Sequence, residues 1–217
     1  MTRVIIIGGH GKVALRLARI LADRGDEVTS VIRNDHQSDA VAATGARPVV
    51  ADVEHLDVAG FASVLAGQEV VVWSAGAGGG SPVRTYAVDR DAAIRSVDGA
   101  AAAGVRRYIM VSYFGAGPDH GVPEDDSFYP YAQAKAAADA YLKNSGLDWT
   151  ILGPSRLTDA AGTGRIELAH QTIQEKGQVS RDNVAQVAAV VVAAPSTIGR
   201  VIDFNDGDTP VAVAITR

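Results

Sequence analysis

The chain of 217 residues has no cysteine, which excludes disulfide bonds, thiolate catalysis and cysteine-based metal sites. No apolar run approaches the ~20 residues that a membrane-spanning helix needs, and Val4–Ile7 is too short to be the core of a signal peptide. A net charge of −5 provides no broad basic surface for nucleic acid. We therefore expect a soluble, cytoplasmic protein without a nucleic-acid or membrane partner.

What the chain does contain is 47% hydrophobic residues, enough for a sizeable core, in a length that predicts a single domain over residues 1–217. Short runs rich in Val and Ile predict strands at Val4–Ile7, Glu27–Ile32, Arg47–Ala51, Glu69–Trp73, Arg107–Val111, Asp148–Leu152 and Arg200–Phe204. Ala-rich stretches between them predict helices at Lys12–Arg24, Gln37–Thr44, Val58–Ala66, Tyr86–Ala103 and Tyr131–Ser145.

A glycine follows each predicted helix, as expected where a helix ends: Gly25, Gly45, Gly67, Gly104 and Gly146. Strands that alternate with helices pair in parallel through right-handed crossovers. The sequence therefore predicts an α/β fold, a doubly wound parallel sheet with helices on both faces. The long stretch Tyr113–Tyr129, rich in glycine and proline, is predicted to be an irregular loop beside the substrate.

The first predicted strand runs into a glycine-rich turn at the start of a helix. Gly8, Gly9, Gly11 and Ala14 fit the spacings GxxGxxA and GxGxxA. Such a turn needs a tight bend, backbone that can approach a pyrophosphate, and a small residue where the helix crosses the strand. The N-terminus of the helix then supplies free N–H groups to the anion, so the pattern predicts a dinucleotide site.

The second predicted strand ends beside Arg33, about twenty residues beyond the glycines, where an NAD site usually has an acidic residue for the ribose 2′-hydroxyl. A guanidinium suits a 2′-phosphate instead, so NADP(H) is the expected cofactor. Asp35 is close by and keeps NAD(H) open. Asp52 follows the third strand, near the expected adenine, and the small residues Ser74–Gly76 after the fourth let backbone lie against the cofactor.

Tyr131 and Lys135 are four residues apart near the start of a predicted helix, which places both on one face. An ammonium near a phenol lowers the pKa of the phenol, and a phenol can give a proton to a carbonyl that receives hydride. The pair therefore predicts acid/base chemistry, with Lys135 also able to hold the nicotinamide ribose. The five histidines lack the spacing of metal ligands, so no metal site is expected.

Segments spread over nearly the whole chain resemble one known family. They are Gly8–Ala14, Arg33, Ala51–Val53, Ser74–Gly76, Ala103–Arg107, Val111–Ser112, Tyr131–Lys135, Ser145–Leu152, Leu157–Asp159 and Ser180–Ala185. Together they resemble the atypical short-chain dehydrogenase/reductase superfamily, in its compact NAD(P)H-binding branch that includes NmrA-like and biliverdin/flavin-reductase-like proteins. The resemblance implies a Rossmann-like fold with a small C-terminal substrate region, formed mostly by residues 153–195.

The resemblance also implies the residues of the site. Those expected to bind the cofactor are Gly8, Gly9, His10, Gly11, Lys12, Val13, Arg33, Asp52, Val53, Ser74, Ala75, Gly76, Val111, Lys135 and Pro154. Those expected to be catalytic are Tyr131, Lys135 and, provisionally, Ser112 as the hydroxyl that orients the substrate, with Tyr113 as a second candidate. The chain departs from its relatives at Gly153-Pro154-Ser155, where they usually have Arg-Pro-Gly.

We accordingly expect an NADP(H)-preferring oxidoreductase that acts on a small carbonyl or alcohol. Two alternatives stay open: a non-catalytic NADP(H) sensor of the NmrA type, and a flavin- or biliverdin-type reductase that needs no tyrosine acid. An epimerase or dehydratase fits less well, because the portion after Leu152 is small for a sugar-nucleotide site. The apolar face of Tyr86–Ala103 leaves a homodimer open.

Overall fold

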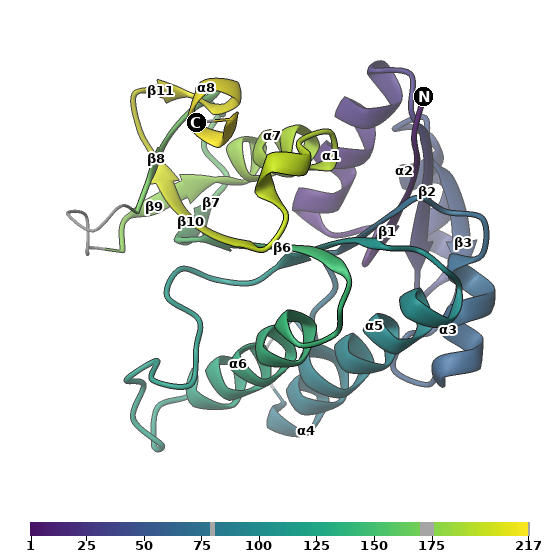
Figure 1. Ribbon diagram of the computed structural model, residues 1–217, viewed down its shortest axis with the longest axis horizontal. Coiled ribbons are helices and arrows are strands. Elements are labelled where there is room, and N and C mark those ends of the chain that lie inside the picture. The colour runs from purple at the N-terminus through teal and green to yellow at the C-terminus, as the bar shows by residue number, and fades with distance from the viewer. Residues whose placement is uncertain (79–80, 170–175, 217) are drawn as a thin grey trace.

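The computed structural model describes residues 1–78, 81–169 and 176–216, and in that part a large, mostly parallel sheet lies between two layers of helices (Figure 1). The order of its strands is β11-β8-β10-β6-β5-β4-β1-β2-β3. The strands are β1 (Arg3–Ile7), β2 (Glu27–Ile32), β3 (Arg47–Val50), β4 (Val70–Trp73), β5 (Arg107–Val111), β6 (Asp148–Pro154), β8 (Arg165–Leu168), β10 (Arg200–Asp206) and β11 (Thr209–Pro210). The segment 3-2-1-4-5-6 is the Rossmann order, so the predicted fold class is confirmed.

Helices cover both faces of this sheet (Figure 1). On one face lie α1 (Lys12–Asp23), α7 (Arg181–Val192) and α8 (Val211–Thr216). On the other lie α3 (Val58–Leu65), α4 (Pro82–Thr85), the π-helix η2 (Tyr86–Ala92), α5 (Ala93–Ala102) and α6 (Tyr129–Lys143). Short helices η1 (Asp35–Gln37) and α2 (Ser38–Ala42) precede β3, and η3 (Pro195–Thr197) precedes β10.

Each central strand is buried on both sides, as its continuous apolar sequence predicts. In β1, Val4 and Ile6 belong to the core beneath α1 and α7, whereas Ile5 and Ile7 belong to the core beneath α3 and α5. The five glycines that follow the predicted helices all have positive φ, which confirms those helix ends.

The seven predicted strands are all present, and residues 112–128 contain neither helix nor strand, as predicted for the loop. The prediction of one helix over Tyr86–Ala103 was wrong in detail, because its first two turns are the π-helix η2. The sequence also gave no prediction of α7. Eight of its twelve residues are buried, so its more exposed face is too narrow for an amphipathic pattern to stand out.

The region after β6 contains several short strands. Strands β7 (Arg156–Thr158) and β9 (Gln178–Ser180) form a small parallel sheet of their own, and β8 runs antiparallel to β10 at the far edge of the main sheet. Residues 170–175 of this region lie outside the described part of the chain. None of the described helices is both long and apolar enough to cross a membrane.

The packing of α3 against α5 depends on Gly99, where a Cβ would lie 2.4 Å from Cβ of Phe61. We predict that Gly99→Ala lowers the free energy of unfolding by about 1–3 kcal/mol through overpacking. Helix propensity alone predicts the opposite sign, a gain of about 1 kcal/mol. Urea denaturation measures the difference, and a more stable variant would contradict this account of the interface.

Candidate functional site

The conformation of the turn after β1 is fixed by backbone hydrogen bonds. The N–H groups of Gly8 and Gly9 donate to the carbonyl of Val31 at 3.2 and 2.8 Å, and Gly11 N–H donates to Gly8 O at 2.9 Å. Gly8 has a φ of +85°, and a Cβ there would lie 2.6 Å from Cα of Ala75. Only glycine fits this position, because both the backbone conformation and the neighbouring strand end exclude a side chain.

Helix α1 begins directly after this turn without a side-chain cap. Gly11 is its N-cap residue, and its first turn has no acidic residue. The first N–H groups of the helix therefore have no side-chain acceptor, and together with the helix dipole they form a site for an anion. The glycine spacing predicts a phosphate at this position.

Two cavities meet at this turn, at the carboxyl ends of the central strands. The first, of about 270 Å³, extends from Gly8 towards Arg33 and Asp52, and the second, of about 880 Å³, extends towards Tyr131. They share Gly11, Ser74, Ala75 and Gly76. The shared residues lie between β1 and β4, where the strand order reverses, and this is where ligands bind in open α/β sheets. The arrangement suits one elongated ligand.

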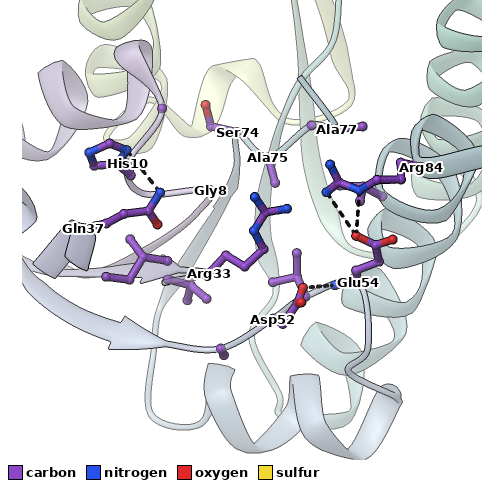
Figure 2. Close-up of a pocket in the computed structure, with 17 residues that line it drawn as sticks. Gly8, His10, Arg33, Gln37, Asp52, Glu54, Ser74, Ala75, Ala77 and Arg84 are labelled. Carbon is purple, nitrogen blue, oxygen red and sulfur yellow. Dashed lines mark hydrogen bonds and ion pairs between the residues drawn. The ribbon is translucent and has the colours of Figure 1, made fainter. Parts of the chain in front are cut away.

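The first cavity has two guanidinium groups on its wall (Figure 2). Arg33 extends into it from the end of β2, and in the described chain the guanidinium of Arg33 makes no ion pair. Arg84 of α4 enters from the opposite side and is held by Glu54, with Nε and Nη2 at 3.2 and 3.1 Å from one carboxylate oxygen. The carboxylate of Asp52 accepts a hydrogen bond from the backbone N–H of Glu54 at 3.1 Å, and this bond fixes the Asp52 carboxylate at the base of the first cavity.

The second cavity is more apolar and has a polar inner end. Its apolar wall is formed by Phe128, Pro130 and Leu157. The polar residues that line it include Tyr131, Ser112 and Asp89. Near the glycine turn, Asp159 joins two cations, with Lys12 Nζ at 2.6 Å and Arg181 Nη1 at 3.0 Å. These contacts connect the substrate-side region to the N-terminus of α1.

Beneath the second cavity lies a buried group of charges. Lys135 is 1% exposed, and its ammonium donates to Val111 O at 2.8 Å and contacts Met110 Sδ at 3.4 Å. Burial lowers the pKa of Lys135, while the nearby carboxylates of Asp139 and Asp89 oppose this shift. Ser112 donates its hydroxyl proton to Asp139, whose pKa is raised by burial. Lys135 is therefore the counter-ion of two buried acids.

The pKa of Tyr131 is raised, whereas its spacing from Lys135 predicts a lowered pKa. The partial burial of its ring raises the pKa of the phenol, and the carboxylates of Asp89 and Asp139 raise it further. The lowering expected from Lys135 is absent because the ammonium is directed at Val111 O. The rings of Phe128 and Tyr113 pack against Tyr131, with centroids 5.2 and 5.8 Å away. The phenol is therefore protonated at neutral pH and suited to donate a proton.

Most of the residues predicted from the sequence line these cavities. In the first cavity they are Gly8, His10, Gly11, Arg33, Asp52, Val53, Ser74, Ala75 and Gly76. In the second they are Gly11, Lys12, Val13, Ser74, Ala75, Gly76, Val111, Ser112 and Tyr131. Gly9, Lys135 and Pro154 line neither cavity. Gly9 packs against Ser30, and Pro154 pairs with Phe204 inside the sheet. The roles of all these residues remain predictions.

Sequence reasoning missed three charged residues of the site: Glu54, Arg84 and Asp89. The ion pair of Arg84 with Glu54 spans thirty residues and has no short-range signal. Asp89 has a weak short-range signal, because Ala92 and Ala93, three and four residues after it on the same helical face, are apolar and buried.

Comparison with known proteins agrees with this geometry. Residues 8–195 match a protein family described as NAD(P)H-binding. The uncharacterized sugar epimerase YhfK of Bacillus subtilis is 33% identical to this chain, over 99% of both proteins.

Two solved structures are also similar over nearly the whole chain. A putative NAD-dependent epimerase/dehydratase of Bacillus halodurans is 32% identical, with a TM-score of 0.90 over 99% of both chains. The oxidoreductase ylbE of Lactococcus lactis is 26% identical, with a TM-score of 0.87 over 98% of this chain and 94% of that one. The chain thus belongs to the NAD(P)H-binding family, of the atypical short-chain dehydrogenase/reductase type that its motifs resemble.

Proposed function

We propose that this protein is an NADP(H)-dependent reductase of a small carbonyl compound. The observation that carries the proposal is the joining of two unlike cavities at Gly76, one with free guanidinium charge and one with a protonated phenol. A dinucleotide that lay across this junction would have its phosphates at α1, its adenosine half beside Arg33 and its nicotinamide half beside Tyr131. The junction fits such a ligand because the residues common to both cavities are small: two glycines, an alanine and a serine.

The preference for NADP(H) over NAD(H) is supported by charge. Arg33 presents a guanidinium without an ion pair among the described residues, and this group suits a 2′-phosphate through paired hydrogen bonds. Arg84 adds a second cation on the facing wall, although Glu54 offsets part of its charge. Asp52 would be the acceptor for an adenine amino group or a ribose hydroxyl.

The chemistry divides between the cofactor and this chain. The nicotinamide supplies hydride to a carbonyl carbon when bound. Tyr131 donates a hydrogen bond and then its proton to the carbonyl oxygen. The hydroxyl of Ser112 donates its hydrogen bond to Asp139, so in this arrangement it does not donate one to the carbonyl oxygen. Lys135 keeps Asp89 and Asp139 in place by its charge.

The walls of the second cavity favour a neutral substrate with an apolar body. Phe128 and Leu157 are large apolar side chains that remain 41% and 37% exposed beside it. Glu124 and Asp126 lie at the same cavity and disfavour an additional anion. The small size of this region supports a reductase over a sugar-nucleotide epimerase.

The cofactor preference is tested by Arg33→Ala. We expect the Kd for NADPH to rise about tenfold or more, because a charge-assisted contact to the 2′-phosphate is lost, and the Kd for NADH to change less than twofold. Titration calorimetry with both cofactors measures this. Arg106→Ala is the control, since Arg106 precedes β5 at the opposite end of the sheet and pairs with Asp148. Equal weakening of both cofactors would refute the 2′-phosphate contact.

The acid is tested by Tyr131→Phe. We expect kcat for carbonyl reduction to fall about 100-fold or more, with the Kd for NADPH unchanged within twofold, because the proton donor alone is removed. Tyr141→Phe is a matched control on the same helix, where the hydroxyl bonds Asp98 away from the cavity. A variant that stays fully active with free flavin would favour the flavin-reductase alternative. Tight NADPH binding by a wild type without turnover would favour the sensor.

The raised pKa of Tyr131 predicts the pH dependence of the reaction. A general acid acts only while protonated, so raising its pKa moves the loss of rate to higher pH. We expect kcat at saturating NADPH and substrate to show no falling limb from Tyr131 between pH 7 and 10, where an ordinary tyrosine is half ionised at about pH 10. A limb centred below pH 9 that disappears in Tyr131→Phe would contradict the geometry.

A further inference from the structure

Asp89 is a buried acid at the second cavity to which the proposed reaction gives no direct role. It lies on the π-helix η2, is 2% exposed and is part of the cavity wall. One carboxylate oxygen, Oδ2, accepts the N–H of Ala77 at 2.9 Å. Local π-helical turns often occur at functional sites, and this one directs the acid towards the end of β4.

The other oxygen, Oδ1, has no hydrogen-bond donor among the described residues. It lies against Gly76, where a Cβ would be only 2.9 Å from it. Gly76 belongs to both cavities, so Oδ1 is at their junction, next to a position that has no side chain to cover it. Oδ1 is not fully enclosed by protein, so a ligand in the second cavity can reach it and donate a hydrogen bond to it.

The position along the cavities identifies the chemistry of that ligand. If the phosphates lie at the N-terminus of α1, the next group towards Tyr131 is the nicotinamide ribose, whose two hydroxyls are hydrogen-bond donors. Lys135, which the motif suggests for this ribose, is already directed at Val111 O and does not line the cavity. An ammonium donates and cannot accept the hydroxyl protons in any case, whereas the carboxylate of Asp89 lines the cavity and can accept them.

We propose that Asp89 Oδ1 binds the nicotinamide ribose of NAD(P)(H) by accepting its hydroxyl protons, while Ala77 N–H fixes Oδ2. This inference rests on the cofactor placement proposed above. The surrounding charges are consistent with it. Lys135 and Arg84 favour the carboxylate form against the pKa increase that burial causes, and Tyr131 lies near enough to be influenced by the acid.

The test uses two ligands that differ by the nicotinamide half. NADPH contains the second ribose, whereas adenosine 2′,5′-bisphosphate contains only the adenosine half with its phosphates. We expect Asp89→Asn to raise the Kd for NADPH about tenfold or more and to leave the Kd for the bisphosphate within twofold, as measured by calorimetry. The asparagine keeps an oxygen for Ala77 N–H and loses the charged acceptor.

Asp91→Asn is the matched control, because Asp91 lies on the same π-helix, carries the same charge and pairs with Arg90 at the surface. It should leave both Kd values unchanged. An Asp89→Asn protein that binds both ligands as the wild type does would overturn the proposal, and so would equal weakening of both ligands. A wild type that binds neither ligand would refute the cofactor site itself, and the inference with it.

A second measurement needs no variant and covers the case in which Asp89→Asn fails to fold. The wild-type protein is titrated with NADP and with an analogue whose nicotinamide ribose lacks its 2′- and 3′-hydroxyls. The proposal expects about tenfold or greater weakening for the analogue. Equal affinities would overturn it.

Discussion

The site depends on the close approach of two backbone turns, the one after β1 at Gly8 and the one after β4 at Ala75. Ser74 N–H donates to Ile7 O at 2.9 Å, so the parallel pairing of β1 and β4 continues up to the turns. A side chain at Gly8 would separate them. Strand β2 pairs with the outer side of β1, and β5 pairs with the outer side of β4. The contact between the two turns therefore marks the point where the strand order reverses, and both cavities open there.

A second constraint is electrostatic. Three charges, Asp89, Lys135 and Asp139, are almost completely removed from water under the second cavity. Removing one partner from such a group leaves an uncompensated buried charge, so the three residues stabilise the structure only together. They also set the properties of the cavity above them, because both acids oppose ionisation of Tyr131. The buried charges therefore connect the stability of this region to the protonation of the phenol.

The sequence predicted the local features well and the long-range ones poorly. The strands, the turn at Gly8 and the exposed Arg33 follow from patterns within a few residues. The spacing of Tyr131 and Lys135 correctly places both on α6, but the same face of a helix does not guarantee a mutual contact. The direction of Lys135 is decided by Val111 O on a neighbouring strand, and the Arg84–Glu54 pair joins α4 to the loop after β3. Such contacts depend on the complete fold.

This difference changes the chemical meaning of the motif. Had Lys135 faced the phenol, its charge would have lowered the pKa of Tyr131, and the residue could serve equally as base or acid. With the ammonium directed at Val111 O, the phenoxide is disfavoured, since the phenol is partly desolvated and the charges of Asp89 and Asp139 that act on it are negative. A phenol in that environment releases its proton only to an oxygen that is gaining negative charge. A protonated phenol is the state that the proposed reduction of a carbonyl requires of its acid.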